Sequence, residues 1–237
     1  MRLHMMQAPI DMRRLLCWAA NRGLGRRPDD DMGYLLHVLL AGTFGPKAIR
    51  PFRLIWSPRR SAATLYGYSL ADAAGLREEA EAVGTPESLQ VIEPGSIVSK
   101  AMPEALRQGR RIGFETRVRP VVRSSIARDG RTRAREVDIH VWRGRRQRPD
   151  EPVTAERAYG EWLQRRVNGA AHIEVARIAH LRENRAWRGE RGCSAGRDVT
   201  LQGRLVVGDP EKFQALLANG VGRHKAYGYG MLLPRPA

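Results

Sequence analysis

A tyrosine and a histidine three positions apart are the residues of this sequence best suited to carry chemistry. Tyr34 and His37 fall within residues 31–43, a segment whose pattern predicts a helix. Its apolar residues recur at intervals of three and four and form one stripe: Met32, Leu35, Leu36, Leu39 and Leu40. At about 100° per residue, Tyr34 and His37 lie together on the opposite side, within reach of one shared substrate. Because histidine titrates near neutral pH, we expect this pair to transfer protons rather than to pack in the core.

A glycine-rich segment, residues 220–230, is the second candidate site. Four glycines are combined there with three cationic or titratable residues, Arg223, His224 and Lys225. Glycine permits positive φ and close approach of the backbone, so the segment can present N–H groups and cations to a phosphate. It is neither a Walker A loop nor a dinucleotide-binding loop, because a predicted helix precedes it and a strand follows it. A purely structural turn explains the glycines equally well at this point.

The elements that must position these residues recur in two halves. In the first half the patterns predict a strand at 2–8, helices at 11–22 and 31–43, strands at 52–56 and 63–68, a helix at 70–83 and a closing strand at 88–93. The second half predicts strands at 111–122 and 136–142 that pair across an arginine-rich turn, a helix at 154–167, strands at 172–181 and 198–207, a helix at 209–219 and a last strand at 229–233. Pro94-Gly95 predicts a domain boundary, which gives domains at 1–94 and 95–237. The order βαββαβ, found twice, predicts an α+β fold of two tandem ferredoxin-like domains with antiparallel sheets.

The charge points to a nucleic acid as partner. The formal net charge is +16, and all but four of the 41 basic residues are arginines, which bind phosphate with a planar fork and stack on bases. More than half of the excess lies between residues 100 and 150. It gathers on a strand-like run and around the turn signal Asp129-Gly130, at Arg117, Arg119, Arg123, Arg128, Arg131, Arg133 and Arg135. We therefore expect a basic β-hairpin that follows a phosphate backbone.

Other classes are excluded by what the sequence contains. Two cysteines are too few for a disulfide framework or a cysteine metal site. No apolar run reaches the length of a transmembrane helix, and the first residues do not resemble a signal peptide. We expect a cytoplasmic protein in a reducing compartment, with no membrane partner. The aromatic run that RRM domains use to stack bases is missing, which argues against ordinary RRM binding.

The glycine-rich segment also carries a resemblance. The pattern G-x-G-x-x-K-A-x-G-x-G, after a helix that starts with Asp-Pro, resembles the C-terminal signature of CRISPR repeat-processing endoribonucleases, above all the CasE family of the type I-E Cascade complex. Residues 33–40 (Gly-Tyr-Leu-Leu-His-Val-Leu-Leu), with Phe44-Gly45 and residues 51–54 after them, look like the catalytic helix and following strand of that family. The resemblance spans nearly the whole chain and is weakest between residues 71 and 110.

The resemblance implies a reaction. Tyr34 and His37 would be the catalytic residues of a metal-independent endoribonuclease that needs no cofactor. The 2′-hydroxyl beside the scissile phosphate would attack it, which leaves a 2′,3′-cyclic phosphate and a 5′-hydroxyl. The substrate implied is the repeat hairpin of CRISPR precursor RNA, and the mature crRNA would stay bound while the protein joins other Cascade subunits.

Several assignments remain open in the sequence. Related enzymes place a lysine soon after the catalytic histidine, whereas the cation here could be Lys47, Arg50, Arg26, Arg27 or Lys225. We expect RNA contacts from Arg26 and Arg27, from the seven arginines at and around the hairpin, and from Gly222, Arg223, His224 and Lys225. Two other functions fit the same sequence: a non-catalytic RNA-binding subunit of such a complex, and a generic basic nucleic-acid-binding protein.

Overall fold

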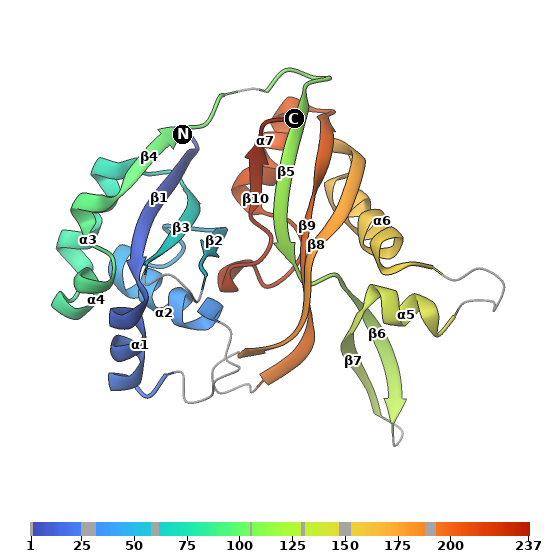
Figure 1. The fold of residues 1–237 in the computed structure, drawn as a ribbon, viewed down its shortest axis with the longest axis horizontal. Helices are drawn as coiled ribbons and strands as arrows, with labels where there is room; N and C mark the ends of the chain where they lie inside the picture. Colours follow the sequence, from blue (N-terminus) through green and yellow to red (C-terminus); the bar gives the residue numbers. More distant parts are fainter. Residues whose placement is uncertain are drawn as a thin grey trace.

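The computed structural model of the chain describes residues 2–24, 32–57, 62–104, 106–128, 131–146, 153–187 and 193–237. Within them the chain forms two four-stranded antiparallel sheets, each with its own helices, and a separate two-stranded ribbon (Figure 1). One hydrophobic core lies in each half. None of the helices in these ranges is both long enough and apolar enough to span a membrane.

The first half contains the predicted catalytic helix. Its elements are β1 (His4–Asp11), α1 (Met12–Asn21), α2 (Met32–Phe44), β2 (Phe52–Ile55), β3 (Ala62–Ser69), α3 (Ala73–Val83), α4 (Pro86–Val91), the short 3-10 helix η1 (Pro94–Ser96) and β4 (Val98–Ala101). The sheet order is β2-β3-β1-β4. Alternate residues of β1, Met6, Ala8 and Ile10, are fully buried, as expected for a strand with one face on the core. Asp11 begins α1 as predicted, because its carboxylate accepts a hydrogen bond from the backbone N–H of Arg14.

The predicted closing strand at 88–93 is wrong. A capping box formed by Thr85 and Ser88, with Pro86 in the first turn, begins α4 there instead. The strand that closes the first sheet is β4, which pairs with β1 beyond residue 94. We therefore propose that the division between the domains lies between β4 and β5, at about residues 102–110, rather than at the predicted residue 94.

The second half repeats the same order with an insertion. Its elements are β5 (Arg111–Val118), β6 (Val121–Arg128), β7 (Arg131–Asp138), α5 (Ile139–Gly144), α6 (Ala155–Val167), β8 (Ala171–Trp187), β9 (Cys193–Val207), α7 (Pro210–Asn219), the 3-10 helix η2 (Lys225–Tyr227) and β10 (Leu232–Arg235). The sheet order β10-β5-β9-β8 corresponds to that of the first sheet. The predicted fold of two tandem ferredoxin-like domains is confirmed.

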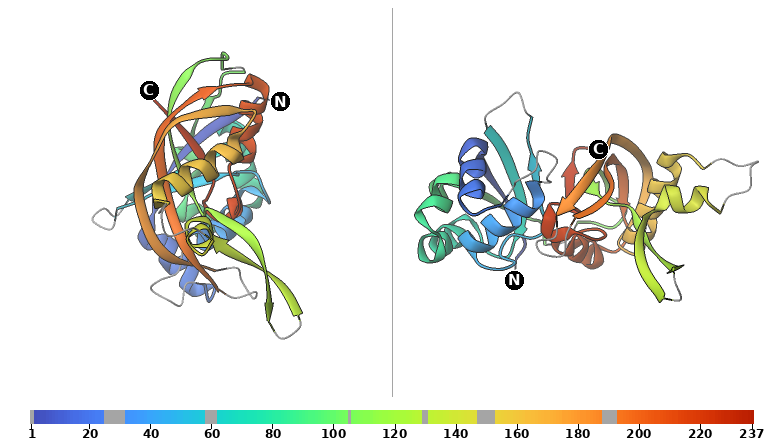
Figure 2. Two further views of the ribbon diagram at one scale, coloured as in Figure 1. Left: turned by 90° about the vertical axis from the view of Figure 1, so that its right-hand side faces the viewer. Right: turned by 90° about the horizontal axis from the view of Figure 1, so that it is seen from below.

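The arginine-rich hairpin is built differently from the prediction. The expected strand at 111–122 is broken at Arg119-Pro120, and its first part, β5, pairs with β9 and β10. The hairpin consists of β6 and β7 alone, with Arg123 opposite Glu136, and residues 139–144 form α5 rather than a strand. We call β6 and β7 the basic ribbon. It extends away from both sheets (Figure 1, Figure 2).

The two halves are joined by specific contacts between β2 or β3 and the second sheet. The Tyr68 hydroxyl donates to the carbonyl oxygen of Leu232 at 2.9 Å, and Arg53 lies 3.0 Å from the carboxylate of Glu115. Both side chains of the ion pair are largely buried, so the charges attract each other with little screening by solvent. These contacts hold the face of α2 near the glycine-rich segment of the second half.

Candidate active site

Helix α2 brings the predicted catalytic pair to the junction of the two domains. Leu35, Leu36 and Leu39 are at most 2% exposed and fix the helix on its sheet. Tyr34 and His37 remain partly exposed on the other side, as the helical pattern predicts. The His37 ring lies edge-on to the Tyr227 ring, with their centroids 5.3 Å apart. The centroid of the Tyr34 ring lies 6.3 Å from that of Tyr227. The structure thus places both residues against the glycine-rich segment.

A glycine of α2 makes this approach possible. The carbonyl oxygen of Tyr227 lies so close to Gly33 that a Cβ there would collide with it, and the Tyr227 carbonyl carbon would be 2.8 Å away. Helices seldom carry glycine in their interior unless a neighbouring segment must come close. Gly33 therefore allows η2 to pack directly on α2, one turn before His37.

Packing inside the protein also requires glycines in the glycine-rich segment. Gly222 and Gly228 have φ of 75° and 77°, and a Cβ would meet the ring of Trp162 at Gly222 or that of Phe52 at Gly228. The positive φ angles and the close contacts agree with the structural turn considered in the sequence analysis. Contact of Gly222 with RNA stays a prediction.

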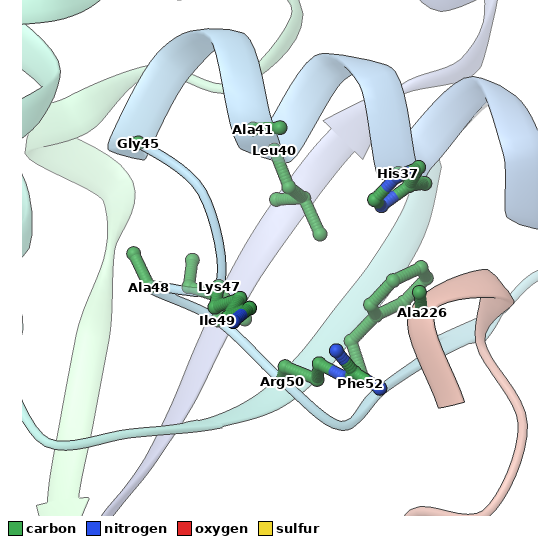
Figure 3. Close-up of a pocket in the computed structure, with 10 residues that line it drawn as sticks. All are labelled: His37, Leu40, Ala41, Gly45, Lys47, Ala48, Ile49, Arg50, Phe52 and Ala226. Atoms are coloured by element: carbon green, nitrogen blue, oxygen red, sulfur yellow. The ribbon is translucent and has the colours of Figure 1, made fainter.

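Two cations lie in the pocket that contains His37. Lys47 and Arg50 line this pocket with His37, and Figure 3 shows His37 directed from α2 toward the space between Arg50, Phe52 and Ala226. Lys225 begins η2, and its Nζ lies 3.5 Å from the carbonyl oxygen of Gly220. Arg26 and Arg27, the other two candidates, lie outside the described residues. Lys47 and Arg50 thus lie in one pocket with His37, and which cation acts in the reaction stays a prediction.

Burial and a nearby charge favour the neutral form of His37. Burial lowers the pKa of His37 below its ordinary value of 6.5, and the positive charge of Arg50 lowers it further. As the pH falls below 6.5, the unfolded chain binds a proton at His37 more readily than the folded protein does. The free energy of unfolding therefore decreases as the pH falls from 6.5 through the lower pKa of the folded state. At neutral pH the imidazole is free to accept a proton.

Arg50→Gln is expected to raise the pKa of His37 toward 6.5. The increase should be incomplete, because burial is the larger cause and remains in the variant. A ¹H–¹³C NMR titration of the histidine rings measures the pKa of His37. Arg107→Gln, at an exposed position in the link between β4 and β5, is the charge-matched control. An unchanged His37 pKa in Arg50→Gln would show that Arg50 does not act on the imidazole.

Two of the predicted RNA-binding arginines turn out to be internal. Arg117 is bonded to Asp198 at 2.6 Å and lies over the ring of Tyr229, and Arg119 is 2% exposed. Although burial raises the pKa of Asp198, Arg117 and Arg182 lower it to about 2, so the carboxylate stays ionised. Their internal partners leave Arg117 and Arg119 little surface for RNA, and we correct the prediction for both. The Arg117–Asp198 pair joins β5 to β9 near the point where the chain leaves for the basic ribbon.

The other five arginines of the predicted hairpin lie on the basic ribbon. Arg123 is exposed on β6. The backbones of Arg128, Arg131, Arg133 and Arg135 lie on β6 and β7, while their side chains fall outside the described part of the structure. Their contact with RNA stays a prediction.

A residue that sequence reasoning missed, Glu136, contacts both Arg223 and His224. Glu136 lies 2.8 Å from Nε of Arg223 and 3.0 Å from Nε2 of His224, whose side chain is 4% exposed. The burial of His224 differs from the predicted phosphate contact. Tyr227 was also missed, because it occupies a variable position of the glycine pattern. No local signal could have found Glu136, because it is 88 residues from His224.

Comparisons with known proteins agree with this architecture. The sequence model for the family described as CRISPR associated protein matches residues 4–236, whereas no curated protein sequence matches the chain. Among solved structures, Thermus thermophilus Cse3 bound to an RNA representing a pre-cleavage complex has a TM-score of 0.65 and 20% identity over 100% of both chains. Cas6e from Escherichia coli K-12 has a TM-score of 0.63 and 18% identity, over 99% of this chain and 100% of that one.

A subunit of a CRISPR RNA-guided surveillance complex is also similar, with a TM-score of 0.60 and 16% identity over 99% of this chain and 100% of that one. At these identities the likeness shows a shared fold. The family match covers almost the entire sequence, including α2 and the glycine-rich segment. This chain therefore belongs to the CRISPR-associated protein family.

Proposed function

We propose that this protein is a metal-independent endoribonuclease that cleaves the repeat hairpin of CRISPR precursor RNA and keeps the mature crRNA as a subunit of Cascade. The observation that carries the proposal is the meeting of Tyr34 and His37 with Tyr227 at the domain junction. His37 also lines a pocket that contains Lys47 and Arg50. Family membership and the likeness to Cse3 bound to RNA support it.

The chemistry follows from the placement of these groups. The RNA 2′-hydroxyl must lose a proton, the 5′-oxygen must gain one, and the phosphorane between them carries extra negative charge. His37, neutral at pH 7, accepts the proton of the 2′-hydroxyl, and a well-placed transfer of this kind contributes about 10²- to 10⁴-fold in rate. Tyr34 orients the attacking hydroxyl, Arg50 or Lys47 stabilises the phosphorane, and the leaving 5′-oxygen takes a proton from solvent water to become the 5′-hydroxyl. No cofactor takes part in this scheme.

The basic ribbon supplies the binding surface for the RNA stem. The ribbon extends from the body of the protein (Figure 2). Arg123 is exposed on β6, and four more arginines are residues of β6 and β7. A two-stranded ribbon fits a nucleic-acid groove, and its charges would displace counterions from the phosphates. The same ribbon contacts the glycine-rich segment through Glu136, which connects the binding surface to the candidate active site.

Cleavage in excess EDTA tests the proposal. With a CRISPR repeat hairpin from the same genome, we expect a single cut at one position, with a 2′,3′-cyclic phosphate on the upstream product and no loss of rate in chelator. A hairpin of equal length and scrambled sequence serves as the control. A strict requirement for Mg²⁺ would instead indicate a metal-activated water as nucleophile and contradict the proposal.

The same experiment separates the other two functions. Tight binding of the repeat hairpin without cleavage would identify a non-catalytic subunit. Equal binding of repeat and scrambled hairpins, lost steeply as salt is raised, would identify a generic basic protein, because unspecific phosphate contacts depend strongly on salt.

A further inference from the structure

A buried carboxylate links the basic ribbon to the glycine-rich segment. Glu136 on β7 binds two consecutive residues, with 2.8 Å to Nε of Arg223 and 3.0 Å to Nε2 of His224. The side chains of Glu136 and His224 are 15% and 4% exposed. In this shielded place the carboxylate must keep its partners, because a buried charge without them is costly. The contact therefore fixes where the segment passes the ribbon.

His224, one of the two residues that Glu136 binds, directly precedes the short helix η2. His224 has φ of 61° and ψ of 25°, a left-handed conformation that residues other than glycine seldom adopt. Such a conformation persists when the surroundings fix it. The carbonyl oxygen of His224 accepts a hydrogen bond from the backbone N–H of Tyr227 at 2.8 Å. The position of His224 thus sets the position of Tyr227.

Tyr227 is the residue that contacts the catalytic pair. Its ring lies 5.3 Å from that of His37 and 6.3 Å from that of Tyr34, and its carbonyl group packs on Gly33. A shift of η2 would therefore change the surroundings of both side chains.

The other end of this path is anchored in the body of the second domain. Asp138, two residues after Glu136, accepts a hydrogen bond from the Tyr159 hydroxyl at 3.0 Å and lies 3.7 Å from Nη1 of Arg197. Tyr159 is on α6 and Arg197 is on β9. The base of the ribbon, and Glu136 with it, is therefore held independently of the ribbon's tip.

We propose that Glu136 is a positioning residue, which orients Tyr227 against Tyr34 and His37 through its contacts with His224 and Arg223. Glu136 does not touch the pair itself. Its effect on cleavage rests on the proposed function, whereas its effect on the surroundings of His37 does not.

The test compares Glu136→Ala with Glu136→Gln and with Glu174→Ala as control. Glu174 also forms a 2.8 Å ion pair with an arginine, Arg111, but on β8, away from the glycine-rich segment. Three quantities are measured: the single-turnover cleavage rate at saturating protein, the Kd for a non-cleavable hairpin, and the ¹H–¹³C NMR signal of the His37 ring.

Glu136→Ala is expected to slow cleavage by about 10- to 100-fold, as for a small misplacement of catalytic groups, and to shift the His37 signal. The Kd should stay the same or fall, because a negative charge is removed from the RNA-binding ribbon. Glu136→Gln should lie between wild type and alanine, since its amide oxygen can still accept the hydrogen bond from His224 while the ion pair with Arg223 is lost. Glu174→Ala should leave all three quantities unchanged.

An unchanged cleavage rate and His37 signal in Glu136→Ala would overturn the proposal. Equal effects in Glu174→Ala would also overturn it, because they would reflect general destabilisation. If Glu136→Ala does not fold, Arg223→Ala replaces it as the test, because it removes one of the two contacts at a side chain that is 41% exposed. An unchanged His37 signal in Arg223→Ala would then contradict the proposal. If wild type does not cleave, the proposed function fails, and the NMR signal still decides the role of Glu136.

Discussion

Cleavage of the repeat hairpin by His37→Ala is expected to be about 10²- to 10⁴-fold slower than by wild type, with almost the same Kd for the hairpin. The imidazole acts on a proton that moves only in the transition state, so its loss affects the rate and not the binding of the substrate. Its place beside Tyr227, away from the basic ribbon, is consistent with this separation. Single-turnover kinetics at saturating protein, with filter binding of a non-cleavable hairpin, measure both quantities.

Two further variants make this result specific. Tyr34→Phe should lose less activity, because it keeps the ring near Tyr227 and removes only the hydroxyl. His172→Ala, at an exposed histidine of β8, should cleave like wild type. If His37→Ala cleaved at the wild-type rate, His37 would have no part in proton transfer.

The parts of the structure that depend on neighbouring residues could be predicted from the sequence. The sequence predicts helices that start at Asp11, Thr154 and Asp209, and in the structure each of these side chains caps its helix by accepting a hydrogen bond from the backbone N–H three residues later. The periodicity of α2 placed its leucines in the core and left Tyr34 and His37 on the other side. The error at 88–93 was local too, because Thr85 and Pro86 are helix-starting residues that the strand interpretation passed over.

The parts that depend on distant partners could not be predicted. Arg117 and Arg119 are predicted to bind RNA because they belong to the cluster of arginines around one hairpin, but Asp198 meets Arg117, and Tyr229 meets both, only after the second sheet has formed. The pairing of Glu136 with His224 likewise joins β7 to a loop from which it is separated in the chain by five elements, α5, α6, β8, β9 and α7. The cation near His37 was left open for the same reason, until the fold placed Lys47 and Arg50 in one pocket with it.

The second large effect is expected on the substrate side. A single 2′-deoxy nucleotide just upstream of the scissile phosphate should abolish cleavage, because it removes the nucleophile itself. The Kd should stay close to that of the all-ribose hairpin, since one hydroxyl is a small part of a surface dominated by phosphate contacts. A 2′-deoxy nucleotide one position downstream serves as the matched control and should be cut normally.

Cleavage of this 2′-deoxy hairpin by wild-type protein, in excess EDTA, is the most direct test of the central claim that the RNA attacks its own phosphate beside Tyr34 and His37. The account predicts that the deoxy hairpin is bound and not cut, while the all-ribose hairpin is cut to a 2′,3′-cyclic phosphate in the same buffer. Cleavage of the deoxy hairpin would show that water is the nucleophile and would contradict the roles given to Tyr34 and His37.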